Sequence, residues 1–403
     1  MRFTLIANLI SAACAFGLTI IFSRFLQNED FATIAIWSSL FSWGQFIISL
    51  SSAGFVVRAT VSGGRNEGII SIVTIVHYVS FMVILSFSTW FIVGLLAKGN
   101  LANYSALFLF SGILASLTAI QSAISGFYRF IELHKEANII QLYFSLGTLI
   151  LSSIFAAIGV LDVVDRVRIP VVVLSAIFLL YKPGFGVILR RLELRPLKEI
   201  LVFVKYSLGF VGHSAAHTIV GGLDRLILSG HVGAAELGNY HVIKQGAESL
   251  RIIGQAIQSQ MAPKFLKQLH EGKFEQSKAL TDRFVMYIAA GVLFSLSASS
   301  ILFFLSGRGL NASIISLSFI LVVSNAIYSV YDFRSLSWSL GRGYGLSVRS
   351  MVVCTMYAIA LCLLQSRIGL INMSFTYLVF TISLLLSTRL VPVSRDNNDP
   401  NSL

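Results

Sequence analysis

The chain has 403 residues, of which 56% are hydrophobic and 12% are charged. Soluble domains carry about 25% charged residues, so an ordinary soluble protein is excluded. Apolar runs of about 20 residues recur along the whole sequence, which predicts a polytopic membrane protein built from α-helices.

The net charge of +12 would be typical of a nucleic-acid-binding protein if the chain were soluble. Here the basic residues are spread over the loops between spans, without a run of Arg and Lys interleaved with aromatic residues, so no nucleic-acid partner is expected. Basic residues of membrane proteins collect in cytoplasmic loops. Placing the N-terminus inside puts roughly three times as many of them on that side as on the other, so both termini are expected in the cytoplasm.

Twelve membrane spans are expected from the apolar runs. They lie roughly at 4–23, 31–56, 69–97, 102–126, 138–160, 169–189, 203–223, 236–261, 284–305, 311–331, 346–366 and 371–391. The basic segment Tyr181–Lys205, with its two prolines, separates them into two sets of six. The expected fold class is an all-α polytopic membrane protein with about 12 transmembrane helices in two six-helix lobes around a central cavity. The expected parts are an N-terminal lobe at 1–189, a basic cytoplasmic linker at 190–202, a C-terminal lobe at 203–391 and a cytoplasmic tail at 392–403.

Arg58 ends the second span, after Gln45 and a run of mostly small residues at 49–54. At the end of the span, it can anchor the helix at the cytoplasmic interface.

The seventh span carries His213 and His217 four residues apart on one helix face, and ends with Asp224 and Arg225. A histidine pair at this spacing can bind a metal, but no third ligand is apparent, so no metal site is expected. The pair is a candidate to bind a substrate or to titrate in a cavity. The alternative is a pair of satisfied polar residues between helices. Asp224 is expected in a helix-end ion pair with Arg225, with ion coupling as its alternative role.

The eighth span carries a continuous polar stripe, because its polar residues recur at steps of three and four. These residues are Tyr240, Lys244, Glu248, Arg251, Gln255, Gln258 and Ser259. Cations inside a span should face a water-filled cavity, since lipid exposure costs several kcal/mol per charge. The stripe therefore predicts a cavity. After it, Pro263–Arg283 is expected to form a short amphipathic helix on the cytoplasmic surface.

Enzyme chemistry has no support in the sequence. Cys14, Cys354 and Cys362 fall inside apolar spans without the spacing of a disulfide framework or a metal site. There is no P-loop and no arrangement typical of a Ser/His/Asp triad, and the external loops are too short for a catalytic domain. No catalytic residue and no cofactor are expected.

Two segments carry a family resemblance. DRLIL at 224–228 and LGNY at 237–240, with Lys244 and Pro263, resemble the signature of the seventh and eighth spans of Wzx-type polysaccharide flippases. SRFL at 23–26 and EDF at 29–31 resemble the family's pattern after the first span, although Ala32 replaces the usual glycine. The family is a branch of the superfamily that also includes multidrug exporters.

The resemblance implies a transporter with two six-helix lobes. It would flip an undecaprenyl-diphosphate-linked oligosaccharide, the O-antigen repeat unit, from the cytoplasmic to the periplasmic face of the bacterial inner membrane in lipopolysaccharide biosynthesis. The mechanism would be ion-coupled alternating access. Membrane lipids, a polysaccharide polymerase and a chain-length regulator would be its partners.

A diphosphate cargo gives the stripe a role. Lys244 and Arg251 are the leading candidates for substrate binding, because cations pair with phosphate oxygens and arginine does so through forked donors. Gln255 suits sugar hydroxyls, and the resemblance makes the pair His213 and His217 a candidate to bind the sugar. Similar flippases often have a basic residue near the end of the second span, so the resemblance also makes Arg58 a candidate for substrate binding, with the interfacial anchor equally open. Glu248 either neutralises the two cations or couples transport to an ion gradient. A carboxylate between two cations stays deprotonated, which favours the ion pair.

Two other functions are weighed against this one. A multidrug exporter of the same superfamily needs acidic residues in its cavity, whereas the stripe is net positive. A membrane-embedded polysaccharide polymerase usually displays a long external loop with catalytic residues, and no such loop is expected here.

Overall fold

The computed structural model describes residues 2–26, 28–49, 52–96, 101–131, 133–180, 197–305, 312–337, 343–364 and 369–388. Within these ranges the regular structure is helical throughout. The elements are α1 (Arg2–Phe25), α2 (Asn28–Ser49), α3 (Ser52–Leu96), α4 (Leu101–Phe130), α5 (His134–Ala157), α6 (Asp165–Leu180), α8 (Leu197–Leu208), α9 (Val211–Thr218), the π-helix η1 (Ile219–Leu223), α10 (Asp224–Leu228), α11 (Ala234–His270), α12 (Phe274–Leu305), α13 (Ala312–Ser335), α14 (Gly343–Leu363) and α15 (Leu370–Ser387).

The described helices are those of a membrane protein. Eight of them are long and apolar enough to cross a bilayer, and α14 adds a shorter apolar stretch at Gly345–Leu361. Large apolar side chains such as Phe294 and Met356 lie exposed on the outside of the bundle, as a lipid environment requires. The prediction of a multi-pass, all-helical membrane protein is confirmed.

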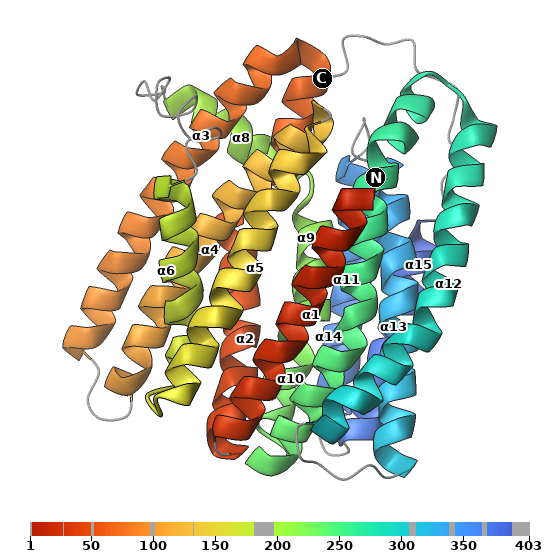
Figure 1. The fold of residues 1–403 in the computed structure, drawn as a ribbon. Helices are drawn as coiled ribbons and strands as arrows, with labels where there is room; N and C mark the ends of the chain where they lie inside the picture. The colour runs from red at the N-terminus through yellow and green to blue at the C-terminus, as the bar shows by residue number, and fades with distance from the viewer. Residues whose placement is uncertain are drawn as a thin grey trace.

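Two groups of helices make up the molecule (Figure 1). In the first, α3 packs along α4, α1 along α5 and α2 along α4; in the second, α11 packs against α12 and α13, and α13 against α15. The chain passes between the groups at Gly209–Phe210. Before this turn α8 packs on α3 and buries Phe203 in the core of the first lobe; after it α9 packs on α14. The expected second lobe, starting at 203, thus begins with residues that pack on the first.

The lobes meet where α1 and α2 pack against η1, α10 and α11. Glycine permits the closest approach. A Cβ added at Gly222 would lie 2.6 Å from the Cα of Ser39, a distance that real Cβ atoms essentially never show. A second contact between the lobes lies at the C-terminal end of α1, where the Arg24 Nε donates a hydrogen bond of 2.9 Å to the Leu305 carbonyl of α12.

Span ends differ from the expected ones in two places. The span expected at 31–56 ends at Ser49, and α3 starts at Ser52 with a non-helical Gly64 inside it. The amphipathic surface helix expected at Pro263–Arg283 is wrong. Instead α11 continues through Pro263 to His270, a turn follows with Gly272 in the left-handed region (φ 71°), and α12 begins at Phe274.

The cause of this second difference is packing by α11 and α12, which are both longer than the expected spans. Phe265 of α11 and Phe284 of α12 are buried, and both pack against Phe333 of α13, with ring centroids 5.0 Å and 4.3 Å apart. Phe265, Leu266 and Leu280 of the segment are buried, so these apolar residues cover protein rather than the membrane surface. The basic linker residues 190–196 and the tail 392–403 lie outside the described residues.

Candidate functional site

The seventh span is broken, and the break positions the charged residues. A turn at Gly209–Phe210 divides it, and a second irregularity, η1, opens the helix just before Asp224. Single π-helical turns widen a helix locally and occur often at functional sites. The consecutive glycines Gly221 and Gly222 lie in this turn against Ser42 and Ser39 of α2. The break turns Asp224 and Arg225 toward α11.

Asp224 and Lys244 form a closed ion pair. The Lys244 Nζ lies 2.6 Å from both carboxylate oxygens and also donates to the Val220 carbonyl at 3.0 Å. The Tyr240 hydroxyl and the Arg225 backbone N–H donate to the same carboxylate. Both charged side chains are completely buried. Since removing one partner of such a pair leaves an uncompensated charge, it costs about 3–5 kcal/mol of stability.

Arg225 bridges the two lobes. Its guanidinium donates to Glu248 of α11 at 2.9 Å, to the Gly221 carbonyl at 2.7 Å and to the Ser38 hydroxyl of α2 at 2.7 Å. The other oxygen of Glu248 lies 3.9 Å from the Arg251 guanidinium. Glu248 is therefore shared between a buried arginine at the lobe contact and a partly exposed arginine farther along α11.

Two histidines of α9 face α13. The His213 Nε2 lies 3.6 Å from the Asp332 carboxylate, and its Nδ1 contacts the Tyr331 hydroxyl at 2.9 Å. The His217 Nδ1 contacts the Tyr328 hydroxyl at 2.8 Å. Arg251 and Glu248 lie within electrostatic range of His217. We call His213, His217, Glu248, Arg251 and Asp332 the second-lobe cluster.

The predicted stripe thus has two environments. Lys244 has no exposed surface, whereas the Arg251 side chain is 21% exposed. Gln255, one turn beyond, and His217 are exposed. Glu248 pairs with Arg251, as the ion-pair interpretation expects, but its second partner is Arg225.

The remaining expectations have these outcomes. Lys244 is neutralised by Asp224 and not by Glu248, and Asp224 pairs with Lys244 rather than with the guanidinium of Arg225. Arg58 lies exposed on α3, with its guanidinium 5.2 Å from the centroid of the Tyr206 ring on α8. Among the described residues, no group of three or more His, Cys, Asp or Glu side chains is arranged to hold a metal ion.

Asp332 is the residue that the sequence analysis missed. It follows an apolar run at the expected end of a span, where it resembles an ordinary loop acid. In the structure α13 continues to Ser335, so Asp332 lies one residue beyond Tyr331 on a helix. The polar side chains Tyr328, Tyr331 and Asp332 at helical spacing were the available signal.

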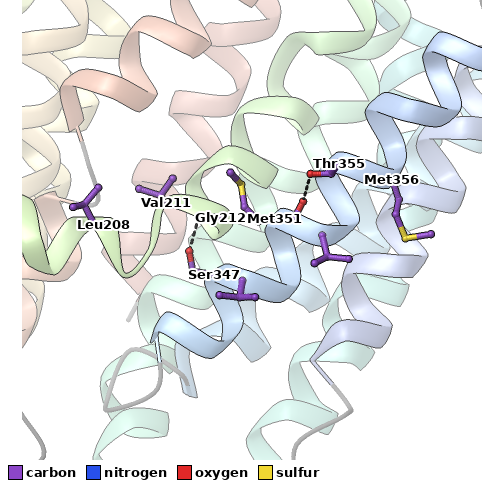
Figure 2. A pocket seen from close by; sticks show the side chains of 9 residues that line it. Leu208, Val211, Gly212, Ser347, Met351, Thr355 and Met356 are labelled. Carbon is purple, nitrogen blue, oxygen red and sulfur yellow. Dashed lines mark hydrogen bonds between the residues drawn. The ribbon is translucent and has the colours of Figure 1, made fainter.

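An apolar groove of about 550 Å³ lies along α9 and α14 (Figure 2). It is lined by Leu208, Val211, Gly212, Ser347, Val348, Met351, Val352, Thr355 and Met356. At its base the Gly212 N–H donates to the Ser347 hydroxyl at 2.7 Å. Val348, Met351 and Met356 are exposed, so the groove opens to the outside of the bundle.

No protein-family model matches the chain, and no curated protein matches it. Solved structures do match. The MATE multidrug transporter DinF-BH has a TM-score of 0.73 at 12% identity, over 96% of this chain and 93% of that one. A MATE transporter from Vibrio cholerae has a TM-score of 0.63 at 14% identity, over 97% of both chains.

This chain has the MATE transporter fold. That fold has twelve transmembrane helices in two lobes, which confirms the expected fold class. A further match, at 14% identity, a TM-score of 0.57 and 96% coverage of both chains, is an inward-facing multidrug-resistance transporter of the MATE family and the MOP superfamily. The matched proteins are transporters rather than enzymes. The resemblance to the Wzx branch, the inner membrane and the orientation of the termini stay predictions.

Proposed function

We propose that this protein is an alternating-access transporter that flips an undecaprenyl-diphosphate-linked oligosaccharide, an O-antigen repeat unit, from the cytoplasmic to the periplasmic face of the bacterial inner membrane. The proposal needs two surfaces at membrane depth. One must hold a polar head of sugars and diphosphate, and the other must let the hydrocarbon chain remain in lipid.

One observation carries the proposal: the polar contacts to α13 and the apolar groove involve different residues of the same two helices, α9 and α14. On α9, His213 contacts Tyr331 of α13 while Val211 lines the groove. On α14, buried Ser350 contacts Tyr331 while Met351, the next residue, lines the groove. An amphiphilic cargo can occupy both surfaces, whereas a water-soluble one needs the polar surface alone.

Arg251 is the cation best placed to meet a diphosphate. Its contact with Glu248 is long, at 3.9 Å, and its side chain is partly exposed. A 3.9 Å contact between partly exposed groups is weaker than a fully buried contact at 2.6 Å, so an anionic head can replace it at lower cost. Lys244 and Arg225 are held by closer contacts, at 2.6 Å and 2.9 Å. We therefore assign substrate binding to Arg251, with Gln255 and His217 beside it, and a structural role to Lys244.

Export of small organic molecules is the second candidate, and the fold favours it, because matched structures are multidrug transporters. The charges of the second lobe are consistent with it as well. Lys244, Arg225 and Arg251 are balanced by Asp224, Glu248 and Asp332. Within these six side chains, the net positive charge that argued against an exporter is cancelled.

Deletion of the gene separates the two candidates. The flippase proposal expects undecaprenyl-diphosphate-linked single repeat units to accumulate in the inner membrane while surface polysaccharide is lost. Complementation should succeed with the wild type and with Arg283→Ala, an exposed arginine of α12, and should fail with Arg251→Ala. Unchanged polysaccharide together with new sensitivity to cationic drugs would overturn the proposal in favour of the exporter.

A further inference from the structure

Three acidic side chains lie inside the second lobe, and their partners differ. Asp224 is completely buried and paired with Lys244, and Glu248 is shared by two arginines. The two arginines that pair with Glu248 keep their protons near neutral pH. Asp224 has no exposed surface through which it could exchange a proton. Both acids are therefore poorly placed to bind and release protons during transport.

Asp332 has a different partner. Among the described residues, the basic side chain within 4 Å of its carboxylate is His213, with Nε2 and Oδ1 3.6 Å apart. The two side chains are 20% and 19% exposed, so water can reach both. Histidine is the side chain whose charge ordinarily changes near neutral pH. Of the three acids, Asp332 is thus the one whose partner is both titratable and accessible to water.

The surroundings of His213 hold it in place for this role. Its Nδ1 contacts the Tyr331 hydroxyl at 2.9 Å, and that hydroxyl contacts Ser350 of α14 at 2.8 Å. His217, on the same helix, contacts Tyr328 of α13. The charged groups of α11 near this site are Arg251 and Glu248, which act on His217. With both histidines neutral, the acids Asp224, Glu248 and Asp332 match the cations Arg225, Lys244 and Arg251 in number, so a proton on His213 adds one positive charge to this set.

We propose that His213 and Asp332 form a reversible proton-binding site that couples the arrangement of the lobes to pH. A proton on His213 turns a 3.6 Å contact between α9 and α13 into an ion pair and draws α9 toward α13. The helix α9 continues through η1 into α10, where Arg225 bonds to Ser38 of the other lobe. The ligand of the site is thus a proton. The inference rests on the proposed alternating access and is independent of the cargo.

The experiment measures lobe separation without any cargo. Spin labels are placed on exposed Lys135 of α5 and exposed Lys264 of α11, as Lys135→Cys and Lys264→Cys, in a background with Cys14, Cys354 and Cys362 replaced by alanine. Pulsed electron spin resonance then records the distance distribution in lipid nanodiscs at about pH 8 and about pH 5. We expect the distribution to shift with pH in the parent. We expect no shift in His213→Gln or in Asp332→Asn.

Two further variants keep the result interpretable. His231→Gln changes an exposed histidine on the turn after α10 and should keep the full pH response. Asp332→Glu restores the carboxylate and should restore part of it. A variant counts as folded when its distribution at about pH 8 matches that of the parent. A parent that does not respond to pH, or a full response in folded His213→Gln and Asp332→Asn, would overturn the proton site. Neither result would depend on which cargo is flipped.

Discussion

Two ion pairs on α11 are separated by two helical turns and have opposite properties. Lys244 is completely buried, and its Nζ lies 2.6 Å from both oxygens of Asp224. Arg251 is partly exposed and lies 3.9 Å from its acid, Glu248. A buried pair whose hydrogen bonds are all satisfied is costly to break and unable to bind cargo. A longer, partly exposed pair costs less to rearrange. The comparison shows that a charge inside a span is not by itself a sign of a binding site.

The largest expected effect is on the closed pair. Lys244→Ala leaves Asp224 charged without its main partner, so we expect a loss of about 3–5 kcal/mol of stability and much less folded protein. Replacing both residues by apolar ones, as Lys244→Met with Asp224→Leu, should recover most of that loss. Thermal unfolding in detergent, monitored by tryptophan fluorescence, measures the stability of the single and of the double variant. If the double variant is as unstable as the single one, the pair does more than neutralise itself.

An intermediate effect is expected where the lobes touch. Gly222→Ala places a Cβ 2.6 Å from the Cα of Ser39 and must push η1 away from α2, which we expect to cost about 1–3 kcal/mol. Gly233→Ala is the matched control, because a Cβ there meets nothing within 4 Å. Thermal unfolding of the two variants side by side is the measurement. Equal stability would mean that the two lobes separate at this contact without resistance.

The fold was largely predictable and the charge pairing was not. Apolar runs locate most spans, because hydropathy depends on composition along the chain alone. Lys244, Glu248 and Arg251 are predictably on one face, because residues three and four apart share a face of an α-helix. The partner of each charge depends on how α10 and α13 pack against α11. The π-helical break at 219–223, directly before Asp224 and Arg225, leaves no signal in hydropathy either.

Two errors have the same physical origin. An amphipathic segment can cover a membrane surface or the neighbouring helix, and the pattern within Pro263–Arg283 is identical in both cases; Gly272 was the one residue that indicated a turn. Asp332 was not singled out because a charge after an apolar run usually marks the end of a span. In the structure that helix continues and the charge pairs with His213.

We propose that the Arg251–Glu248 pair takes part in cargo binding and that the Lys244–Asp224 pair does not. The most direct measurement is flipping of undecaprenyl-diphosphate-linked repeat units in inverted inner-membrane vesicles by Arg251→Ala and Arg251→Lys, with thermal unfolding of the same samples. We predict at least about a tenfold loss of flipping in Arg251→Ala, partial activity in Arg251→Lys, and a stability change within about 1 kcal/mol in both. A wild-type flipping rate in folded Arg251→Ala would contradict the account.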